Sequence, residues 1–385
     1  DQPRSRGLGD VYKRQICMCG YSSTDDEKYM RHAIELAKKG LGWTNPNPMV
    51  GAVIVKDGKI IGEGYHKKYG ELHAETSALN NCTKSPEGAT IYVTLEPCCH
   101  HGKQPPCTEA IIKAGIKRVV IGSLDPNPLV SGKGIQILRE HNIQVDNKLV
   151  CNRECIDMNY VFFHYIKEKM PYVIVKYAQT LDGKIATHNG LSKWITGEAA
   201  RENVHMDRHR YSAIMVGINT VLKDDPMLNC RSKAIENPRQ PVRIVCDTKL
   251  RIPYDSKLVK TAGQIPVWIV TCCNDKERIS MYENAGCEII AMEGEKIDIA
   301  QLMIILGRRG IDSCICEGGA ELNWSVIKSG MVKRIQAYIA PKIFGGVDAP
   351  ASVAGTGFDA PDDALKLKDY TVTRLGDDIL IEGEV

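Results

Sequence analysis

The sequence predicts an α/β protein of two domains. Its 385 residues exceed the ~100–200 residues of a usual single domain. Helix-like and strand-like segments alternate along both halves of the chain, which is typical of α/β folds. This alternation is interrupted near residues 168–171, where a charged run ends and Pro171 begins a new strand-like segment. We therefore expect one domain over 25–168 and a second over 169–385.

The first half begins with a tail, residues 1–24, which we expect to be non-native or disordered because it lacks apolar periodicity. A helix is predicted over 25–39, since Thr24 is a suitable N-cap, the first turn is acidic and Gly40 follows. Asp57-Gly58 between two strand-like runs predicts a hairpin over 50–65. Later segments of this half are predicted as helices 73–80, 107–114 and 151–165 and strands 89–95 and 117–122.

The second half shows the same alternation with longer intervals. Residues 199–210 are predicted as a helix, with acidic residues early and basic residues late, as the helix dipole favours. The other expected elements are helices 299–309 and 322–328 and strands 172–177, 213–216, 242–246, 267–270, 313–316 and 334–340.

Composition excludes several classes of protein. Hydrophobic residues make up 43% and charged residues 25% of the chain, as in ordinary globular proteins. A net charge of +3 gives no electrostatic argument for nucleic-acid binding, and no apolar run reaches the ~18 residues of a membrane span. The 15 cysteines form no disulfide ladder and no secretory pattern is present, so we expect a cytoplasmic protein with reduced, mostly buried thiols.

The strongest chemical motif combines His73-Ala74-Glu75 with Cys98 and Cys107. One imidazole and two thiolates leave the fourth tetrahedral position of a zinc ion to water, which is the catalytic pattern. Zinc lowers the pKa of such a water to about 7. Glu75 is then free to shuttle protons, as the conserved glutamate does in zinc deaminases. The motif predicts His73, Cys98 and Cys107 as ligands of one zinc ion and Glu75 as the catalytic residue.

The spacing of the two cysteines departs from the general zinc-deaminase signature, which is Pro-Cys-x-x-Cys. Eight residues, 99–106, separate Cys98 from Cys107, so the two thiols cannot share one helix turn. We expect Cys98 to end a strand and Cys107 to open the next helix, where a helix N-terminus stabilises a thiolate. The intervening Cys99, His100 and His101 are alternative ligands; we expect Cys99 to have no role and one histidine to face the substrate.

The chain resembles the family of bifunctional deaminase/reductases of riboflavin biosynthesis. In the first half the resemblance is carried by Pro46-Asn47-Pro48-Met49-Val50-Gly51, Gly64-Tyr65-His66, His73-Ala74-Glu75, Thr94-Leu95-Glu96-Pro97-Cys98, Pro105-Pro106-Cys107 and Asp125-Pro126-Asn127-Pro128. The second half matches at Lys176-Tyr177-Ala178, residues 180–186 and 192–197, Gly217 to Leu222, Asp224-Asp225-Pro226 and Glu317 to Leu322. The long gap between the cysteines is a feature of this family, and the match covers about residues 25–385.

The resemblance implies a cytidine-deaminase-like α/β/α zinc domain followed by a dihydrofolate-reductase-like α/β domain. It implies that a phosphoribosylaminopyrimidine loses its 2-amino group as ammonia, and that NADPH then reduces the ribose of the product to ribitol. Asn47, His66 and His100 would bind the substrate of the deaminase. Without the resemblance, Asn47 would be explained equally well by turn formation between two prolines.

For the reductase, no Gly-x-Gly-x-x-Gly motif supports a Rossmann site, but Gly318-Gly319 before a helix is a plausible phosphate cradle. By the resemblance, the NADPH site consists of Ala178, Trp194, Thr220, Asp224, Gly318, Gly319, Ala320, Glu321 and Leu322. The substrate would be bound by Lys176, Asp182, Ser192, Arg208, Leu228, Arg231 and Glu317. Guanidinium groups at Arg208 and Arg231 suit a 5′-phosphate, although Arg208 could equally be a solvated helix end and Trp194 a core aromatic.

Two other classes of protein remain open at this point. One is a nucleoside or tRNA zinc deaminase with an accessory C-terminal domain; the long cysteine gap and the low net charge disfavour it. The other is a zinc-stabilised interaction module, which three ligands beside a free glutamate disfavour, because structural zinc sites fill all four positions. We expect small-molecule substrates, no nucleic acid, no membrane and a homo-oligomer.

Overall fold

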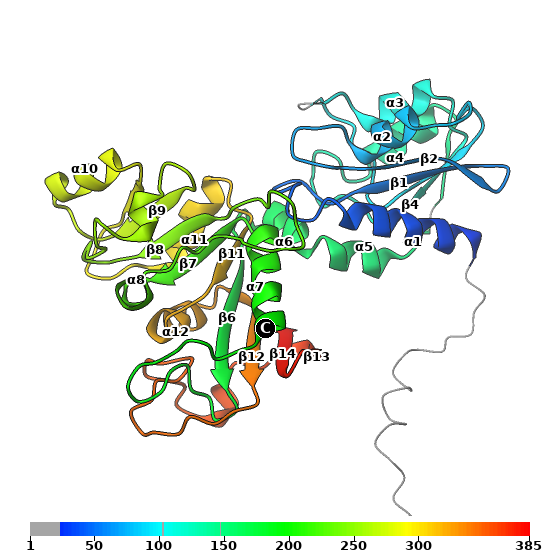
Figure 1. Ribbon diagram of the computed structural model, residues 1–385. Coiled ribbons are helices and arrows are strands. Elements are labelled where there is room, and N and C mark those ends of the chain that lie inside the picture. The colour runs from blue at the N-terminus through cyan, green and yellow to red at the C-terminus, as the bar shows by residue number, and fades with distance from the viewer. Residues whose placement is uncertain (1–23, 102–103, 147) are drawn as a thin grey trace, which may run out of the picture.

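The computed structural model describes residues 24–101, 104–146 and 148–385, which form two α/β bodies (Figure 1). The expected tail lies outside the described residues except for Thr24, whose hydroxyl accepts a hydrogen bond from the Glu27 amide at 3.3 Å and so caps the first helix. The α/β alternation predicted for both halves is confirmed. Within the described ranges, no helix is long and apolar enough to cross a membrane.

The first body contains a sheet of five strands in the order β2-β1-β3-β4-β5. β1 runs antiparallel to both of its neighbours, whereas β3, β4 and β5 are parallel. Their bounds are β1 (Gly51–Lys56), β2 (Lys59–Tyr65), β3 (Thr90–Val93), β4 (Arg118–Ile121) and β5 (Gln144–Val145). The predicted hairpin around Asp57-Gly58 is β1–β2, and Gly58 has a φ of +70°, as such a turn requires.

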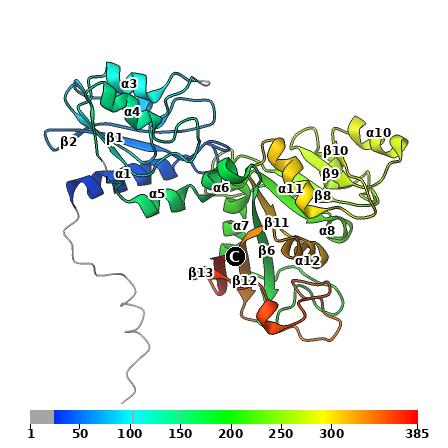
Figure 2. The ribbon, with the colours of Figure 1, turned by 180° about the vertical axis from the view of Figure 1, so that it is seen from behind.

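Helices cover both faces of this sheet. On one face, Met30, Ala33 and Ile34 of α1 pack against Val53 and Val55, and α5 lies beside α1. On the other face, α2, α3 and α4 cover a second apolar layer (Figure 2). The helices are α1 (Asp25–Lys38), α2 (Ala74–Asn80), α3 (Cys107–Lys113), α4 (Lys133–Glu140) and α5 (Asn152–Met158). This is the α/β/α arrangement that the resemblance implied.

The second body contains a sheet of nine strands in the order β10-β9-β8-β7-β11-β6-β12-β14-β13. The strands from β10 to β12 are parallel, and β14 and β13 continue the sheet antiparallel. Their bounds are β6 (Tyr172–Thr180), β7 (Ala213–Gly217), β8 (Val242–Cys246), β9 (Val267–Thr271), β10 (Glu288–Ala291), β11 (Ser313–Cys316), β12 (Val332–Ala340), β13 (Lys368–Leu375) and β14 (Asp378–Glu384).

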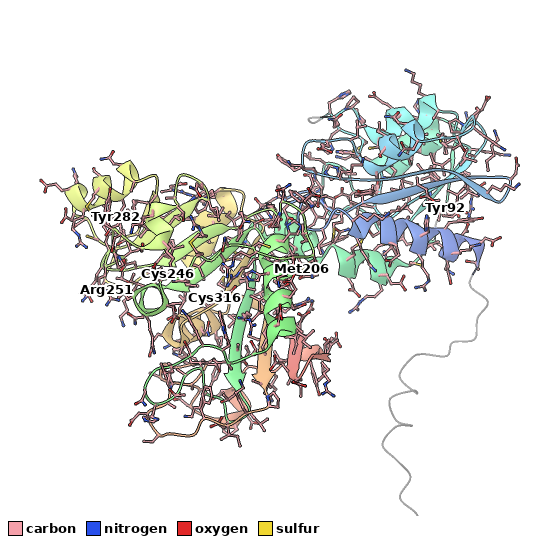
Figure 3. All side chains as sticks on the ribbon, viewed as in Figure 1. Tyr92, Met206, Cys246, Arg251, Tyr282 and Cys316 are labelled. Carbon is pink, nitrogen blue, oxygen red and sulfur yellow. The ribbon has the colours of Figure 1, made fainter. Side chains whose placement is uncertain are left out.

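Apolar layers lie on both faces of the second sheet. α11 and α12 bury Leu302, Leu306 and Val326 on one face, while α9 and α10 bury Leu258 and Tyr282 on the other. The remaining elements are α7 (Glu198–Arg210), α8 (Ile218–Asp224), α9 (Lys257–Lys260), α10 (Lys276–Asn284), α11 (Ile299–Arg308), α12 (Ala320–Lys328) and the short 3-10 helix η2 (Pro361–Asp363). Cys246 and Cys316, labelled in Figure 3, are buried strand-end thiols of this core. The carboxyl ends of the parallel strands meet at one edge, where a site can form.

The single helix expected over 151–165 is two helices in the structure, α5 and α6 (Tyr160–Glu168). Asn159 separates them with non-helical φ and ψ of −110° and 22°. Its amide accepts from the Met49 backbone N–H and donates to the Met49 carbonyl, both at 2.8 Å. This pairing with a distant loop overrides the helical periodicity, which on its own showed no break. Helices α4, α8, α9 and α10 and strands β5, β10, β13 and β14 were not predicted.

Candidate active sites

The three predicted zinc ligands lie together in the first body. The His73 Nδ1, Cys98 Sγ and Cys107 Sγ atoms are within 4.8 Å of one another. His73 precedes α2, Cys98 follows β3 and Cys107 is the first residue of α3, so three consecutive elements bring the ligands to one point. The two cysteines therefore lie on different elements, as the spacing predicted. One nitrogen and two sulfurs at these separations fit a tetrahedral zinc ion with one position left for water.

The surroundings of Cys98 favour a thiolate. Its Sγ accepts a hydrogen bond from the Cys107 backbone N–H at 3.4 Å and lies 3.5 Å from His73 Nδ1. The side-chain hydrogen bond with Cys107 lowers the pKa of Cys98 to about 4, against the opposing effect of burial. A thiolate is the form that binds zinc.

Glu75 lies in the first turn of α2 and is only 3% exposed. Burial raises the pKa of its carboxyl to about 7. It lines the same cavity as His73 and Cys98. A carboxyl group that faces both a zinc site and a substrate cavity is placed to carry a proton between them.

The cavity beside the ligands has a volume of about 340 Å³. It is lined by the three predicted substrate residues, Asn47, His66 and His100, and by His73, Glu75 and Cys98. His66 directs Nδ1 at the Leu72 carbonyl at 3.1 Å, so Nδ1 donates and Nε2 accepts. The Asn47 amide donates to that Nε2 at 3.4 Å. Burial lowers the pKa of His66, which keeps the ring neutral. Asn47 and His66 therefore form a linked polar wall, and the His66 ring contacts the His73 ring edge-on at a centroid distance of 5.4 Å.

The side chains of Cys99, His100 and His101, in the loop between the two cysteines, take the places that the sequence suggested. His100 lines the cavity, whereas His101 is exposed and pairs with Glu109 at 3.2 Å. Cys99 is outside the ligand cluster, and its Sγ lies 3.7 Å from the Leu129 carbonyl. Residues 102 and 103 of this loop lie outside the described ranges.

Several cavity residues were not predicted. Asp125 and Asn127 follow β4 as Cys98 follows β3, so the rule that adjacent parallel strands meet at their carboxyl ends could have found them. The Asn127 backbone N–H donates to Asp125 Oδ1 at 2.8 Å, and burial raises the pKa of Asp125 to about 6. Phe162, Tyr165 and Ile166 of α6 also line the cavity. Their helical spacing gave only a signal for a buried face.

In the second body, three of the predicted substrate residues form one charged cluster. Arg208 donates to both carboxylate oxygens of Glu317 at 2.8 Å, and Lys176 Nζ lies 3.9 Å from the same group. Burial alone would raise the pKa of Glu317, but the charges of Arg208 and Lys176 overcome that effect and lower the pKa to about 2. Arg208 is therefore a buried paired charge and not the solvated helix end that the sequence left open.

The predicted phosphate cradle lies at the adjoining ends of β7 and β11. The Gly217 amide donates to the Gly318 carbonyl at 2.8 Å, and Gly319 is the N-cap of α12. A Cβ on Gly319 would lie 3.5 Å from Thr220 Oγ1, so Thr220 and the glycines are close together. Gly318 has a φ of +89°, which disfavours any other residue. Small residues and a helix N-terminus at one point suit the phosphates of a dinucleotide.

The other predicted reductase residues are distributed around this edge of the sheet. Arg231 is exposed and linked to α7, because its backbone N–H donates to His205 Nδ1 at 3.2 Å. Trp194 is 65% exposed with the Arg201 guanidinium 4.7 Å from its ring, so it is no core aromatic. Asp182 accepts from the Phe344 and Gly345 amides at 3.2 and 2.8 Å, which anchors a loop.

Leu228, Ala178, Ser192 and Asp224 show less distinctive surroundings. The Leu228 side chain is 4% exposed within the core, with a φ of +50°. Ala178 packs beside Tyr338, and Ser192 and Asp224 are half-buried. Among the predicted reductase positions, the structure therefore brings together the Lys176–Arg208–Glu317 cluster and the Thr220–Gly318–Gly319 cradle most clearly.

Comparisons with known proteins agree with both halves of this description. The model of the cytidine and deoxycytidylate deaminase zinc-binding region matches residues 23–123, and that of the RibD C-terminal domain matches residues 171–381. The riboflavin biosynthesis protein RibD of Actinobacillus pleuropneumoniae is 50% identical over 94% of this chain and 96% of that protein. The chain belongs to the RibD family. It is a bifunctional deaminase and reductase of riboflavin biosynthesis, with a zinc-binding deaminase domain and an NADPH-dependent reductase domain.

Other relatives extend the match across distant organisms and to solved structures. RibD of Escherichia coli is 37% identical over 92% of this chain and 98% of that protein. A deaminase/reductase from Thermotoga maritima aligns with a TM-score of 0.84 at 39% identity, covering 94% of this chain and 98% of that one. RibD of Acinetobacter baumannii aligns with the same TM-score at 36% identity, covering 94% and 99%. The expectation of a single-activity deaminase with an accessory domain is thereby set aside.

Proposed function

We propose that this chain removes the 2-amino group of 2,5-diamino-6-(5-phosphoribosylamino)pyrimidin-4(3H)-one as ammonia. It then reduces the ribose of 5-amino-6-(5-phosphoribosylamino)uracil to a ribityl group with NADPH. These are the reactions for which the Thermotoga maritima relative is named. The observation that carries the proposal is the cluster of His73, Cys98 and Cys107 beside buried Glu75, on one chain with a RibD C-terminal domain.

For deamination, His73, Cys98 and Cys107 would hold the zinc ion and Glu75 would carry the proton to the leaving amine. Zinc, when bound, supplies a hydroxide nucleophile at neutral pH. The Asn47–His66 pair presents amide and imidazole groups to the pyrimidine ring, and His100 lies on the same cavity. Glu75 is buried beside this cavity, so the proton that it holds is shielded from bulk water and is passed to the substrate.

For reduction, NADPH would supply the hydride, with its phosphates at the Gly318–Gly319 cradle and the N-terminus of α12. Thr220, Ala320, Glu321 and Leu322 adjoin this cradle, and we assign Ala178, Trp194 and Asp224 to the same cofactor. Arg231 is exposed, so it can pair with a substrate phosphate without leaving another charge unpaired. Arg208 and Lys176 hold Glu317 ionised, and this cluster, with Asp182, Ser192 and Leu228, would orient the open-chain sugar.

We further propose that the chain acts on small molecules and not on nucleic acid, in the cytoplasm and as a homo-oligomer. The net charge of +3 supports the first statement. All thirteen cysteines in the described ranges are free thiols, which suits a reducing compartment. Exposed apolar residues on the edge strand β13, Tyr370 and Val372, support association. Light scattering from the purified protein would test the oligomeric state.

The test of the proposed function is a coupled assay on the purified zinc-loaded protein. With the diamino substrate and NADPH, we expect ammonia to appear first and NADPH oxidation to follow in equal amount. With the deaminated substrate, NADPH oxidation should proceed without ammonia. Ammonia release from cytidine or tRNA in place of the pyrimidine substrate would contradict the proposal.

A further inference from the structure

The loop between α1 and β1, residues 41–49, carries one wall of the deaminase cavity. Pro46, Asn47 and Pro48 line the cavity, and Asn47 donates to His66 at 3.4 Å. The two prolines restrict the backbone on either side of Asn47. A displacement of this loop therefore also displaces the Asn47 amide.

The outer side of this loop faces the reductase domain. Figure 1 and Figure 2 show the chain after α1 reaching the junction beside α6. There the Asn45 amide donates to Asp312 Oδ2 at 2.7 Å, although the two residues are 267 positions apart. Asp312 precedes β11 of the second sheet. A carboxylate of the reductase domain therefore holds a loop that lines the deaminase cavity.

Asp312 is a rigid anchor. The residue is 2% exposed, and its carboxylate accepts from the hydroxyls of Ser212 and Ser313 at 2.5 and 2.6 Å through Oδ1. These bonds leave Oδ2 for Asn45. A hydrogen bond to a buried, fully paired carboxylate is among the stronger polar contacts in a protein.

A second reductase residue holds the beginning of the same loop. His209 Nδ1 accepts from the Arg239 amide at 3.0 Å, so Nε2 carries the proton and donates to the Leu41 carbonyl at 2.9 Å. The His209 ring also contacts Trp43 edge-on at a centroid distance of 5.0 Å. His209 is the next residue after Arg208, so α7 contributes to both catalytic regions.

Beside the loop lies a small cavity of about 40 Å³, which is lined by residues including Asn45, Asn47 and Asp312. This space allows the loop to shift once the contact from Asp312 is removed. The loop's position is therefore set by its anchors and not by close packing alone.

From these contacts we infer that Asp312 of the reductase domain is a positioning residue of the deaminase. It holds Asn45, and through the intervening Pro46 it fixes the Asn47 amide against His66 for substrate binding. His209 supports the same loop at its other end. The inference rests on the deaminase assignment of the first cavity, and its test separates it from that assignment.

The test uses the full-length zinc-loaded protein and an exchanged pair. Asn45→Asp places two carboxylates against each other and should raise the deaminase KM at least about ten-fold, which corresponds to about 1.4 kcal/mol. The kcat should stay within about three-fold, because Glu75 and the zinc ligands are not on the loop. Zinc content and reductase kinetics with the deaminated substrate should not change.

The double variant Asn45→Asp/Asp312→Asn restores an amide–carboxylate pair in the reversed orientation, and the new amide oxygen can still accept from Ser212 and Ser313. We expect it to recover most of the KM. Asn45→Ala, which removes the bond without repulsion, should give a smaller rise and guards against misfolding of the charged variant. Asn142→Asp adds the same charge at an exposed turn and serves as the control.

The inference is overturned if Asn45→Asp leaves the deaminase KM unchanged, or if kcat and zinc content fall with it. It is equally overturned if the folded double variant, with normal reductase activity, shows no recovery. If the unaltered protein releases no ammonia, the deaminase assignment itself has failed, which is a different result from any of these.

Discussion

The two catalytic regions of this molecule are built in different ways. The deaminase region draws its metal ligands from short motifs at the ends of consecutive elements, and Glu75 lies two residues from His73. The reductase region combines distant residues, since Lys176 and Arg208 lie 141 and 109 positions before Glu317 and both meet its carboxylate. The first depends on the chemistry of a bound ion, whereas the second depends on buried paired charges and a glycine cradle. We therefore expect a substitution in the metal site to lower only deamination, and a substitution in the charged cluster to lower only reduction.

The largest expected effect is that of Glu75→Gln. The amide keeps the size of the side chain but cannot carry the proton, so the deaminase kcat should fall by about 10²–10⁴-fold. Reduction of supplied deaminated substrate should continue at the normal rate. The measurement is ammonia release and NADPH oxidation on the same preparation.

The account of two separate sites would be contradicted if Glu75→Gln lost both activities while circular dichroism showed a folded protein. Such a result would mean that one site performs both steps.

Glu317→Gln tests the reductase side. It leaves Arg208 and Lys176 buried without a counter-charge, and breaking a buried pair in this way costs about 3–5 kcal/mol of unfolding free energy. Urea unfolding should show that loss, and reductase kcat/KM should fall. Glu154→Gln is the control, because the Glu154–Arg31 pair is exposed and is worth at most about 1 kcal/mol.

The lowered pKa of Glu317 also predicts how the stability of the folded protein falls at acid pH. Because the folded-state pKa of Glu317 is lowered to about 2, its contribution is present above the ordinary pKa of about 4.3 and is lost as pH falls toward 2. Glu317→Gln should therefore lose less stability than the unaltered protein between pH 5 and pH 2. Parallel acid-unfolding curves would contradict the account of this cluster.

Gly318→Ala tests the cradle with a smaller change. At a φ of +89° the added Cβ costs about 1–2 kcal/mol of backbone strain. We expect a rise of about ten-fold in the KM for NADPH with deaminase kinetics unchanged. Gly330→Ala, which also has a positive φ of +71° but open space around it and follows α12 at the other end, is the matched control. An equal effect of the two variants on the KM would show that Gly318 has no cofactor role.

Part of this organisation could be predicted from the sequence, and the reason is locality. His73, Glu75, Cys98 and Cys107 carry distinctive chemistry at short spacing, so their pattern survives without knowledge of the fold. Asn159 is an example of what the sequence pattern does not show. It interrupts a segment with helical periodicity because it pairs with Met49, 110 positions away. The strands β13 and β14 were not predicted; β13 is largely exposed, and its apolar residues Tyr370 and Val372 lie outside the core.

The reductase residues depended on resemblance for the same reason. Nothing in the local sequence of Lys176, Arg208 or Glu317 indicates that they meet. Lys176 and Glu317 come together because β6 and β11 are neighbouring strands, and Arg208 reaches them from α7. Asp125 and Asn127 belong to a motif of the resemblance, but their place in the cavity required the further knowledge that β3 and β4 are parallel neighbours. Contacts between residues on different strands leave no pattern in the spacing of residues along a single sequence.

The smallest expected effect concerns Asp207, a buried residue of α7 whose Oδ2 has no hydrogen-bond partner. Burial raises its pKa to about 7, so folding favours the protonated form. Stability is therefore lost as pH rises from about 3.9 to about 7. Asp207→Asn should raise the melting temperature by a few degrees at pH 8, by less at pH 5 and hardly at all below pH 4. The opposite pH order would contradict this assignment.

Removal of zinc with both activities followed on one sample tests the independence of the two regions most directly. A chelator that strips the metal from the unaltered protein should abolish ammonia release, and added zinc should restore it. NADPH oxidation with the deaminated substrate should continue throughout at its original rate. If the metal-free protein, still folded, loses NADPH oxidation together with ammonia release, the division into two independent catalytic regions is wrong.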